Sequence, residues 1–215
     1  MDFNDQELDE LMICRLDHAR KIVEPCTIII FGASGDLTYR KLIPALYHLF
    51  EEGALPNPFK VVGFARREKT DQNWRNELLE GFTKYSRTKD ETPQKWDEFC
   101  NNVHYCQASF DDIEGYKKLE KMLSEFGDPR LRKNLLFYLA TSPTQFALVA
   151  ENLHSTGLLN KNENDDHSER LVVEKPFGTD LKSAQELNTA LNKFAHEKQI
   201  FRIDHYLGKE TVQNI

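Results

Sequence analysis

The chain has 215 residues, of which 40% are hydrophobic and 11% aromatic, enough to build a core in one domain or in one domain and part of another. The net charge of −7 argues against nucleic acid as the main partner, because no basic surplus exists to neutralise phosphates. An acidic N-terminus, no apolar run near the ~18 residues of a membrane span, and four cysteines (Cys14, Cys26, Cys100, Cys106) without zinc-type spacing predict a soluble cytoplasmic protein with no membrane or metal site.

Strand and helix patterns alternate from residue 26 onward. Residues 1–25 have near-helical apolar spacing, which fits a peripheral helix or extension to which no function is assigned. The β-branched run CTIIIF (26–31) predicts a buried strand that ends in a glycine turn. A helix is expected over about residues 37–52. Its apolar face comprises Leu42, Ile43, Leu46, Leu49 and Phe50.

The alternation continues to the end of the chain. Helical patterns carry Trp74 and Leu78, then Trp96 and Phe99, then apolar residues over 113–126, and a further helix opens at Pro143. Residues 161–170 predict a solvated loop. The last helix has a stripe of Leu181, Ala184, Leu187, Leu191 and Phe194. The further predicted strands are KVVGFA (60–65), VHYCQ (103–107), NLLFYLA (134–140), LVVEK (171–175) and IFRID (200–204).

This order predicts an α/β fold with a Rossmann-like, doubly wound parallel sheet and right-handed crossovers. Ligands of such sheets bind beyond the carboxyl ends of the strands. Three informative clusters lie there, at residues 32–37, 65–67 and 174–178, and residues 204–210 follow a fourth strand.

The segment GASGDL (32–37) is the first candidate site. Gly32 fits the first position of the dinucleotide fingerprint G-x-G-x-x-G, whereas Ser34 and Leu37 stand at the other two and Gly35 is offset. The strand before it and the helix after it favour pyrophosphate binding, because a helix N-terminus offers free N–H groups. We therefore predict dinucleotide binding here rather than an ordinary strand-to-helix turn.

The second predicted strand runs into Arg66 and Arg67, where NAD-binding domains usually carry an acid for the ribose 2′-hydroxyl. A guanidinium can instead clasp a 2′-phosphate with charge-assisted hydrogen bonds. The pattern favours NADP over NAD, with a pair of solvated surface arginines as the alternative.

Two further segments carry chemistry. In EKPFG (174–178), Lys175 can point a cation into the crevice, and Lys175–Pro176 is a bond where a cis peptide can occur. In DHYLGKE (204–210), His205 could act as a base oriented by Asp204. Alternatively, His205, Tyr206 and Lys209 could bind a phosphate.

These motifs together resemble the glucose-6-phosphate dehydrogenase family. The resemblance rests on IFGASGDLTYRKLIPALYHLF, VVGFARR, VVEKPFG and RIDHYLGKE, of which the last is the family signature. It runs from about Cys26 to Ile215 and implies an NADP-dependent oxidation of D-glucose 6-phosphate.

The resemblance also implies roles for single residues. Arg66 would take the 2′-phosphate, Lys175 would contact the substrate and the nicotinamide side, and Phe146 stands where a tyrosine often contacts the cofactor. His205, Tyr206 and Lys209 would hold the sugar phosphate. The cofactor-binding set would comprise Gly32, Ser34, Gly35, Asp36, Leu37, Lys41, Arg66 and Lys175.

By the same resemblance, Asp204 would orient a catalytic histidine that lies beyond Ile215, so His205 would be a phosphate ligand rather than the base. The chain is therefore expected to be an N-terminal fragment, inactive alone, whose parent is a homo-oligomer, a dimer or tetramer. The expected division is an extension (1–25), an NADP-binding domain (26–203) and the start of a substrate domain (204–215). The alternatives are a non-catalytic NADP-binding module or another NAD(P)-dependent sugar dehydrogenase with an E-K-P turn.

Overall fold

The computed structural model describes residues 24–85, 93–161 and 168–204. The first predicted strand and helix are present as β1 (Cys26–Phe31), a π-helical turn (Thr38–Leu42) and α2 (Ile43–Glu51). Then follow β2 (Phe59–Ala65), α3 (Asp71–Tyr85), α4 (Trp96–Cys100) and β3 (Val103–Gln107). The remainder comprises α5 (Ile113–Ser124), α6 (Pro129–Lys133), β4 (Asn134–Leu139), α7 (Phe146–Ser155), β5 (Ser168–Glu174), α8 (Leu181–Leu191) and β6 (Ile200–Ile203).

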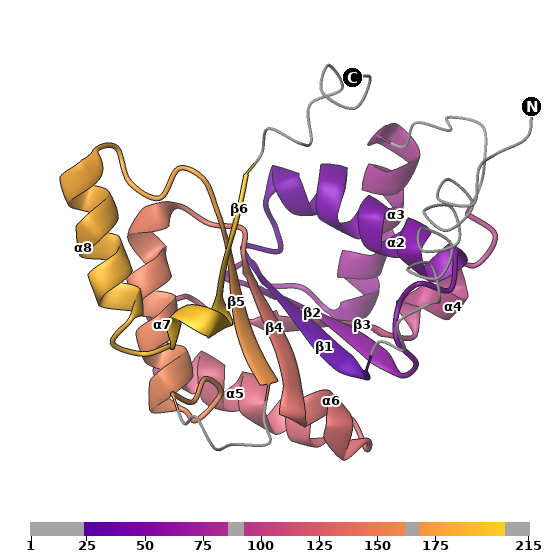
Figure 1. Ribbon diagram of the computed structural model, residues 1–215. Helices are drawn as coiled ribbons and strands as arrows, with labels where there is room; N and C mark the ends of the chain where they lie inside the picture. Colours follow the sequence, from indigo (N-terminus) through magenta and orange to yellow (C-terminus); the bar gives the residue numbers. More distant parts are fainter. Residues whose placement is uncertain (1–23, 86–92, 162–167, 205–215) are drawn as a thin grey trace, which may run out of the picture.

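All six strands form one parallel sheet in the order β3-β2-β1-β4-β5-β6 (Figure 1). The order reverses between β1 and β4, which is the point where dinucleotides bind in doubly wound sheets. Thr27 of β1 is fully buried, and its hydroxyl donates to the carbonyl of Leu131, 104 residues later, at 2.9 Å. The predicted α/β class and Rossmann-like sheet are confirmed.

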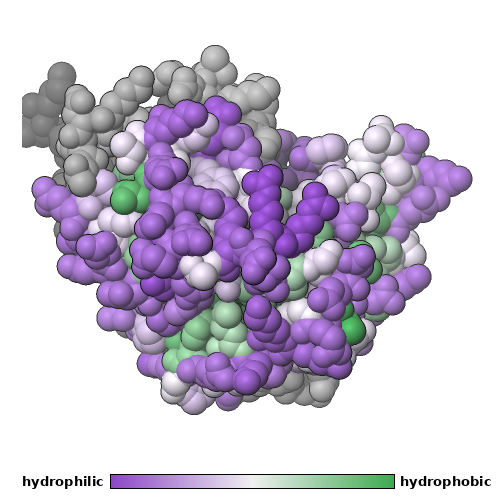
Figure 2. Space-filling model, turned by 180° about the vertical axis from the view of Figure 1, so that it is seen from behind, coloured by the Kyte–Doolittle hydropathy of each residue, from purple (hydrophilic) through white to green (hydrophobic). Residues whose placement is uncertain are grey.

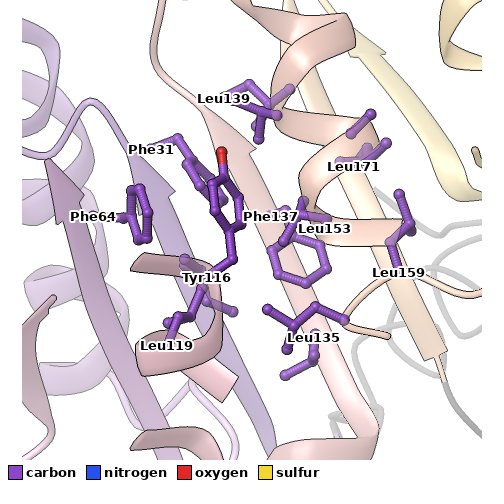
Figure 3. Packing of buried hydrophobic residues seen from close by; sticks show 14 of the residues in the cluster. Phe31, Phe64, Tyr116, Leu119, Leu135, Phe137, Leu139, Leu153, Leu159 and Leu171 are labelled. Carbon is purple, nitrogen blue, oxygen red and sulfur yellow. The ribbon is translucent and has the colours of Figure 1, made fainter. Parts of the chain in front are cut away.

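Helices cover the two faces of the sheet, and the two helical layers cover different numbers of strands. On one face, α5, α7 and α8 pack against strands from β3 to β6 (Figure 1), in a cluster that includes Phe31, Phe64 and Phe137 (Figure 3). On the other face, α2, α3 and α4 pack against β1, β2 and β3. In the described part of the chain, the fully buried members of this second cluster include none from β4, β5 or β6. The sheet is therefore covered more completely at its β1–β3 end.

Three details differ from the sequence-based predictions. Strand β5 begins at Ser168, inside the predicted loop 161–170, because residues 168–170 pair with β4 although their side chains are polar. Leu181 is 75% exposed at the start of α8, and in that helix only Leu191 is buried. In α2 the buried residues are Ile43, Pro44 and Tyr47, whereas Leu49 is exposed. Hydrophobic spacing located these helices but did not give the orientation of each side chain.

The surface seen from behind is covered mostly by hydrophilic side chains, with small apolar patches between them (Figure 2). Among the described residues, no helix is both long and apolar enough to cross a membrane. Those same residues contain no group of three or more His, Cys, Asp or Glu side chains arranged for a metal ion.

Candidate dinucleotide site

A cavity of about 680 Å³ lies beyond the carboxyl ends of β1, β2, β3 and β4. This volume is in the range of sites that hold a small ligand or cofactor. The walls come from four turns that are distant in sequence. They are lined by Gly32, Ser34, Gly35, Ala65, Arg66, Arg67, Ala108, Ser109, Phe110, Asp111, Ala140, Thr141, Ser142, Gln145 and Leu148.

The glycine turn after β1 has a conformation that a larger residue could not adopt without strain. Gly32 has φ +87°, and its N–H donates to the carbonyl of Phe64 at 3.0 Å. A Cβ atom at this position would lie 2.3 Å from the carbonyl oxygen of Ala140 in the neighbouring turn. Glycine thus lets the turns after β1 and β4 approach closely. Any side chain at Gly32 would force these two turns apart.

The turn after β2 places two cations on the same cavity. Arg66 and Arg67 are both exposed and both line it, together with Gly32 and Ser34 from the glycine turn. The strand end carries no carboxylate at this point, since Ala65 precedes the arginines. The guanidinium groups are available to an anion, and the helix that follows the glycine turn adds N–H groups nearby.

The sequence did not predict two walls of the cavity, which are formed by the turns after β3 and β4. Ser109, Phe110 and Asp111 follow β3, and Thr141 and Ser142 follow β4. They carry no glycine or arginine signature, and the signal that could have found them is position alone. The turns at the carboxyl ends of four adjacent strands, β3, β2, β1 and β4, all contribute to this cavity.

Some predicted cofactor residues lie outside this lining. Asp36 forms an ion pair with Arg40 at 3.2 Å on the first helical turn, and Leu37 and Lys41 also follow the glycine turn. Phe146, for which the resemblance implied a position near the cofactor, is 1% exposed and belongs to the core. The cavity therefore brings together Gly32, Ser34, Gly35 and Arg66 from the predicted set, and leaves the others outside its walls.

The lysine–proline turn follows β5. The Lys175–Pro176 bond is cis, as its sequence context allowed. The Lys175 N–H donates to the carbonyl of Ile203 at 3.1 Å, and its ammonium lies 2.7 Å from the carboxylate of Asp204. Both side chains of this pair are about half exposed. Sheet pairing between β5 and β6 therefore brings together two predicted site residues from different motifs.

The residue before Lys175 is held from the neighbouring strand. Burial raises the pKa of Tyr138, so that its hydroxyl stays protonated and donates to the carboxylate of Glu174. His205, Tyr206 and Lys209 lie outside the described residues. The structure accordingly places Lys175 and Asp204 but not the remainder of the DHYLGKE segment.

A dinucleotide fits the residues present. The cavity offers a glycine turn that a Cβ would fill, helix N–H groups beside it, and two arginines at the end of the second strand. These are the groups that a pyrophosphate and a further phosphate require. Nothing in the lining would repel them except Asp111, which follows β3.

Comparison with known proteins agrees with this geometry. Residues 29–214 match the family model described as glucose-6-phosphate dehydrogenase, NAD binding domain. The chain is 44% identical over 193 residues to a glucose-6-phosphate 1-dehydrogenase from Chlamydia pneumoniae, and 41% identical over 194 residues to one from Schizosaccharomyces pombe. These matches cover 89% and 90% of the chain, but in each case 38% of the relative.

Solved structures show the same relation. A glucose-6-phosphate dehydrogenase in complex with its substrate glucose-6-phosphate superimposes with a TM-score of 0.73 at 38% identity, over 91% of this chain and 40% of that one. A glucose-6-phosphate 1-dehydrogenase from Mycobacterium avium gives 0.72 at 31% identity, over 89% of this chain and 38% of that one. The sequence therefore spans about two fifths of the length of these relatives. From residue 29 to residue 214, the chain belongs to the glucose-6-phosphate dehydrogenase family and carries its nicotinamide-dinucleotide-binding domain.

Proposed function

We propose that this chain provides the NADP-binding domain of an enzyme that oxidises D-glucose 6-phosphate to 6-phospho-D-glucono-1,5-lactone, the first step of the oxidative pentose phosphate pathway. The observation that carries the proposal is the shared cavity, in which the glycine turn and Arg66 face the same space. The names of the relatives support the reaction, and the substrate in one related structure supports the sugar phosphate.

The choice of NADP rests on charge. A carboxylate at the end of β2 would accept a hydrogen bond from a ribose 2′-hydroxyl and repel a 2′-phosphate. Arg66 and Arg67 stand there instead, and a guanidinium can make two charge-assisted bonds to a phosphate. The proposed NADP-binding residues are Gly32, Ser34, Gly35, Arg66 and, on the helix beyond the turn, Asp36, Leu37 and Lys41.

The chain's own residues would bind and orient the reactants. Lys175 would direct its ammonium toward the sugar and the nicotinamide side, while His205, Tyr206 and Lys209 would anchor the sugar phosphate. Such anchoring raises the rate by holding the reacting carbon in place. NADP, when bound, supplies the hydride acceptor. Asp204 would orient the histidine that takes the hydroxyl proton, which the family resemblance locates beyond Ile215.

Assembly and location follow from the same proposal. The domain is assigned to residues 26–203, with residues 204–215 beginning the substrate domain. We infer that the enzyme is a homo-oligomer, a dimer or tetramer, that acts in the cytoplasm.

The test compares the 215-residue chain with the same chain extended by the segment that follows the match in the Chlamydia pneumoniae relative. Both are mixed with NADP and glucose 6-phosphate, and NADPH absorbance is followed. We expect both to bind NADP and only the extended chain to produce NADPH. A folded extended chain without activity would contradict the proposed reaction. Activity of the short chain within tenfold of the long one would make His205 the base.

A further inference from the structure

A buried hydroxyl lies directly under the arginine turn. Tyr105 of β3 is 5% exposed, and its hydroxyl oxygen lies 2.8 Å from the carbonyl oxygen of Arg67 and 3.3 Å from that of Ala65. These two carbonyls flank Arg66 in the sequence. One hydroxyl can donate to both in a three-centre arrangement. Tyr105 therefore fixes the backbone on both sides of the residue proposed to bind the 2′-phosphate.

This hydroxyl remains a donor under all physiological conditions. Burial raises the pKa of Tyr105 to about 12, so that the proton is retained. The ring is held in turn by Trp74, whose ring centroid lies 5.3 Å away, and the Tyr105 N–H donates to Asp71 at 2.8 Å. The donor is rigid, because both its backbone and its ring are fixed.

The far end of the turn is held by a second contact. Lys69 is 9% exposed, and its ammonium pairs with the carboxylate of Glu77 on α3. The hydroxyl of Tyr39 donates to the same carboxylate at 2.8 Å. Although burial alone would raise the pKa of Glu77, hydrogen bonds from Lys69 and Tyr39 hold it below its ordinary value, so the carboxylate is ionised.

This second contact also joins the two turns of the cavity. Tyr39 lies in the π-helical turn that follows the glycine turn, and Lys69 lies three residues after Arg66. Glu77 therefore connects the element expected to bind the pyrophosphate with the turn expected to bind the 2′-phosphate. Neither Tyr105 nor Glu77 belongs to the residues that line the cavity.

We propose that Tyr105 and Glu77 are positioning residues, which set the preference of the cavity for a 2′-phosphorylated nucleotide by holding the backbone of residues 65–69. The proposal rests on the proposed function. A turn already held in its binding conformation loses less freedom when the phosphate is bound. Arg66 meets only the 2′-phosphate. Loosening the turn should therefore weaken the binding of nucleotides that carry a 2′-phosphate, and it should leave the binding of nucleotides without this group almost unchanged.

The experiment uses two small ligands that differ only in that group, adenosine 2′,5′-bisphosphate and adenosine 5′-phosphate. Each is titrated calorimetrically into the 215-residue chain and into Tyr105→Phe, Glu77→Gln and Tyr47→Phe. Tyr47→Phe is the matched control, because Tyr47 is 1% exposed and its hydroxyl donates to Glu51 on α2, away from the cavity. Thermal unfolding of each variant is recorded alongside.

We expect Tyr105→Phe to weaken the bisphosphate about 3- to 10-fold, the size of one lost hydrogen bond. Glu77→Gln should weaken it about two- to threefold. The monophosphate should change less than about twofold in both, and Tyr47→Phe should leave the ratio of the two affinities as in the wild type.

The outcomes separate this inference from the proposed function. If the wild-type chain does not prefer the bisphosphate, both the role of Arg66 and this inference are wrong. A different outcome is that the wild type prefers the bisphosphate while Tyr105→Phe and Glu77→Gln keep the wild-type ratio of the two affinities, including the case in which both affinities fall equally. In that case only the positioning role is wrong. If Tyr105→Phe fails to fold, Glu77→Gln tests the positioning role instead. This variant should fold, because Glu77 is 40% exposed and glutamine keeps the shape of the side chain.

Discussion

The two ends of the sheet are stabilised in different ways. Around β1, β2 and β3, helices pack on both faces, and the arginine turn is held by Tyr105 and Glu77. Around β5 and β6, the described helices pack mainly on one face, and residues 201–204 are all exposed. The comparison shows that packing within this domain holds the proposed cofactor side, whereas Lys175 depends on strand pairing and on its contact with Asp204.

The largest expected effect tests this comparison directly with two phenylalanines. Phe64 of β2 is fully buried, whereas Phe201 of β6 is 46% exposed. We expect Phe64→Ala to lower the free energy of unfolding by ~3–5 kcal/mol. Phe201→Ala should lower it by less than ~1 kcal/mol. Urea denaturation of both variants measures the difference, and equal losses would mean that the two ends are equally packed.

A second prediction concerns the glycine turn. Gly32→Ala should destabilise the fold and abolish measurable dinucleotide binding, because it adds strain at φ +87° and places Cβ 2.3 Å from a backbone oxygen. Gly127→Ala is the control, since Gly127 has φ +77° but no atom within 4 Å of a built Cβ. We expect Gly127→Ala to lower the free energy of unfolding by ~1–2 kcal/mol. Gly32→Ala should lower it by at least ~1 kcal/mol more. Thermal unfolding measures both variants. Equal losses of stability in the two would show that the close approach of the turns after β1 and β4 does not contribute to the effect at Gly32.

A third prediction concerns the choice of cofactor. Arg66→Ala should weaken NADP about 10- to 100-fold and leave NAD nearly unchanged, because a charge-assisted contact contributes ~1.5–3 kcal/mol. Arg202→Ala removes the same charge at the other end of the sheet, where Arg202 pairs with Glu197, and should change neither affinity. Fluorescence titration with both cofactors measures this. If the affinities for NADP and NAD fall equally in Arg66→Ala, the role of Arg66 is structural. A small effect on NADP would call for the double variant in which Arg67 is also replaced.

The smallest expected effect concerns the edge strand β3. Burial alone would raise the pKa of Asp71, but hydrogen bonds from His104 and the Tyr105 N–H, with the charges of His104 and Arg75, lower it. A carboxyl with a depressed folded pKa stabilises fully above its unfolded pKa of about 3.9, and this contribution is lost as the pH falls through the folded value.

The variant Asp71→Asn tests this linkage. We expect it to lower the free energy of unfolding at pH 6 by less than ~1 kcal/mol, because solvent screens a half-exposed group. The difference from the wild type should shrink as the pH is lowered below about 4. Urea denaturation at pH 6 and pH 3 measures it, with the exposed Asp97→Asn as control. A difference that is constant with pH would contradict the electrostatic cause.

The sequence predicted the order of strands and helices because each strand is a compact apolar run between polar or glycine-containing turns. It also predicted Gly32 and Arg66 as site residues, and both line the cavity, whereas Lys175 lies outside its lining. It did not predict the exposure of Leu181, because apolar spacing does not tell whether another element covers a helix face. Ser109 and Thr141 carry no chemical signature, so only strand order assigns them to the cavity.

The contact of Tyr105 with the arginine turn was also beyond prediction. The hydroxyl and the Arg67 carbonyl are 38 residues apart, and they meet because β2 and β3 pair in one particular register. A shift of one residue would turn Tyr105 to the opposite face. The contact between Tyr105 and the arginine turn therefore becomes visible only in the paired sheet.

The position of β1 in the sheet has a consequence for how the protein is made. Thr27 in β1 donates to Leu131, which is synthesised 104 residues later, and β4 follows directly after it. At ~5–20 residues per second, the ribosome needs about 5–20 s to add this stretch. During that interval β1 can pair with β2, but the edge that will receive β4 stays open and the Thr27 hydroxyl lacks its native acceptor. The nascent chain therefore exposes an apolar strand edge of the kind that chaperones protect.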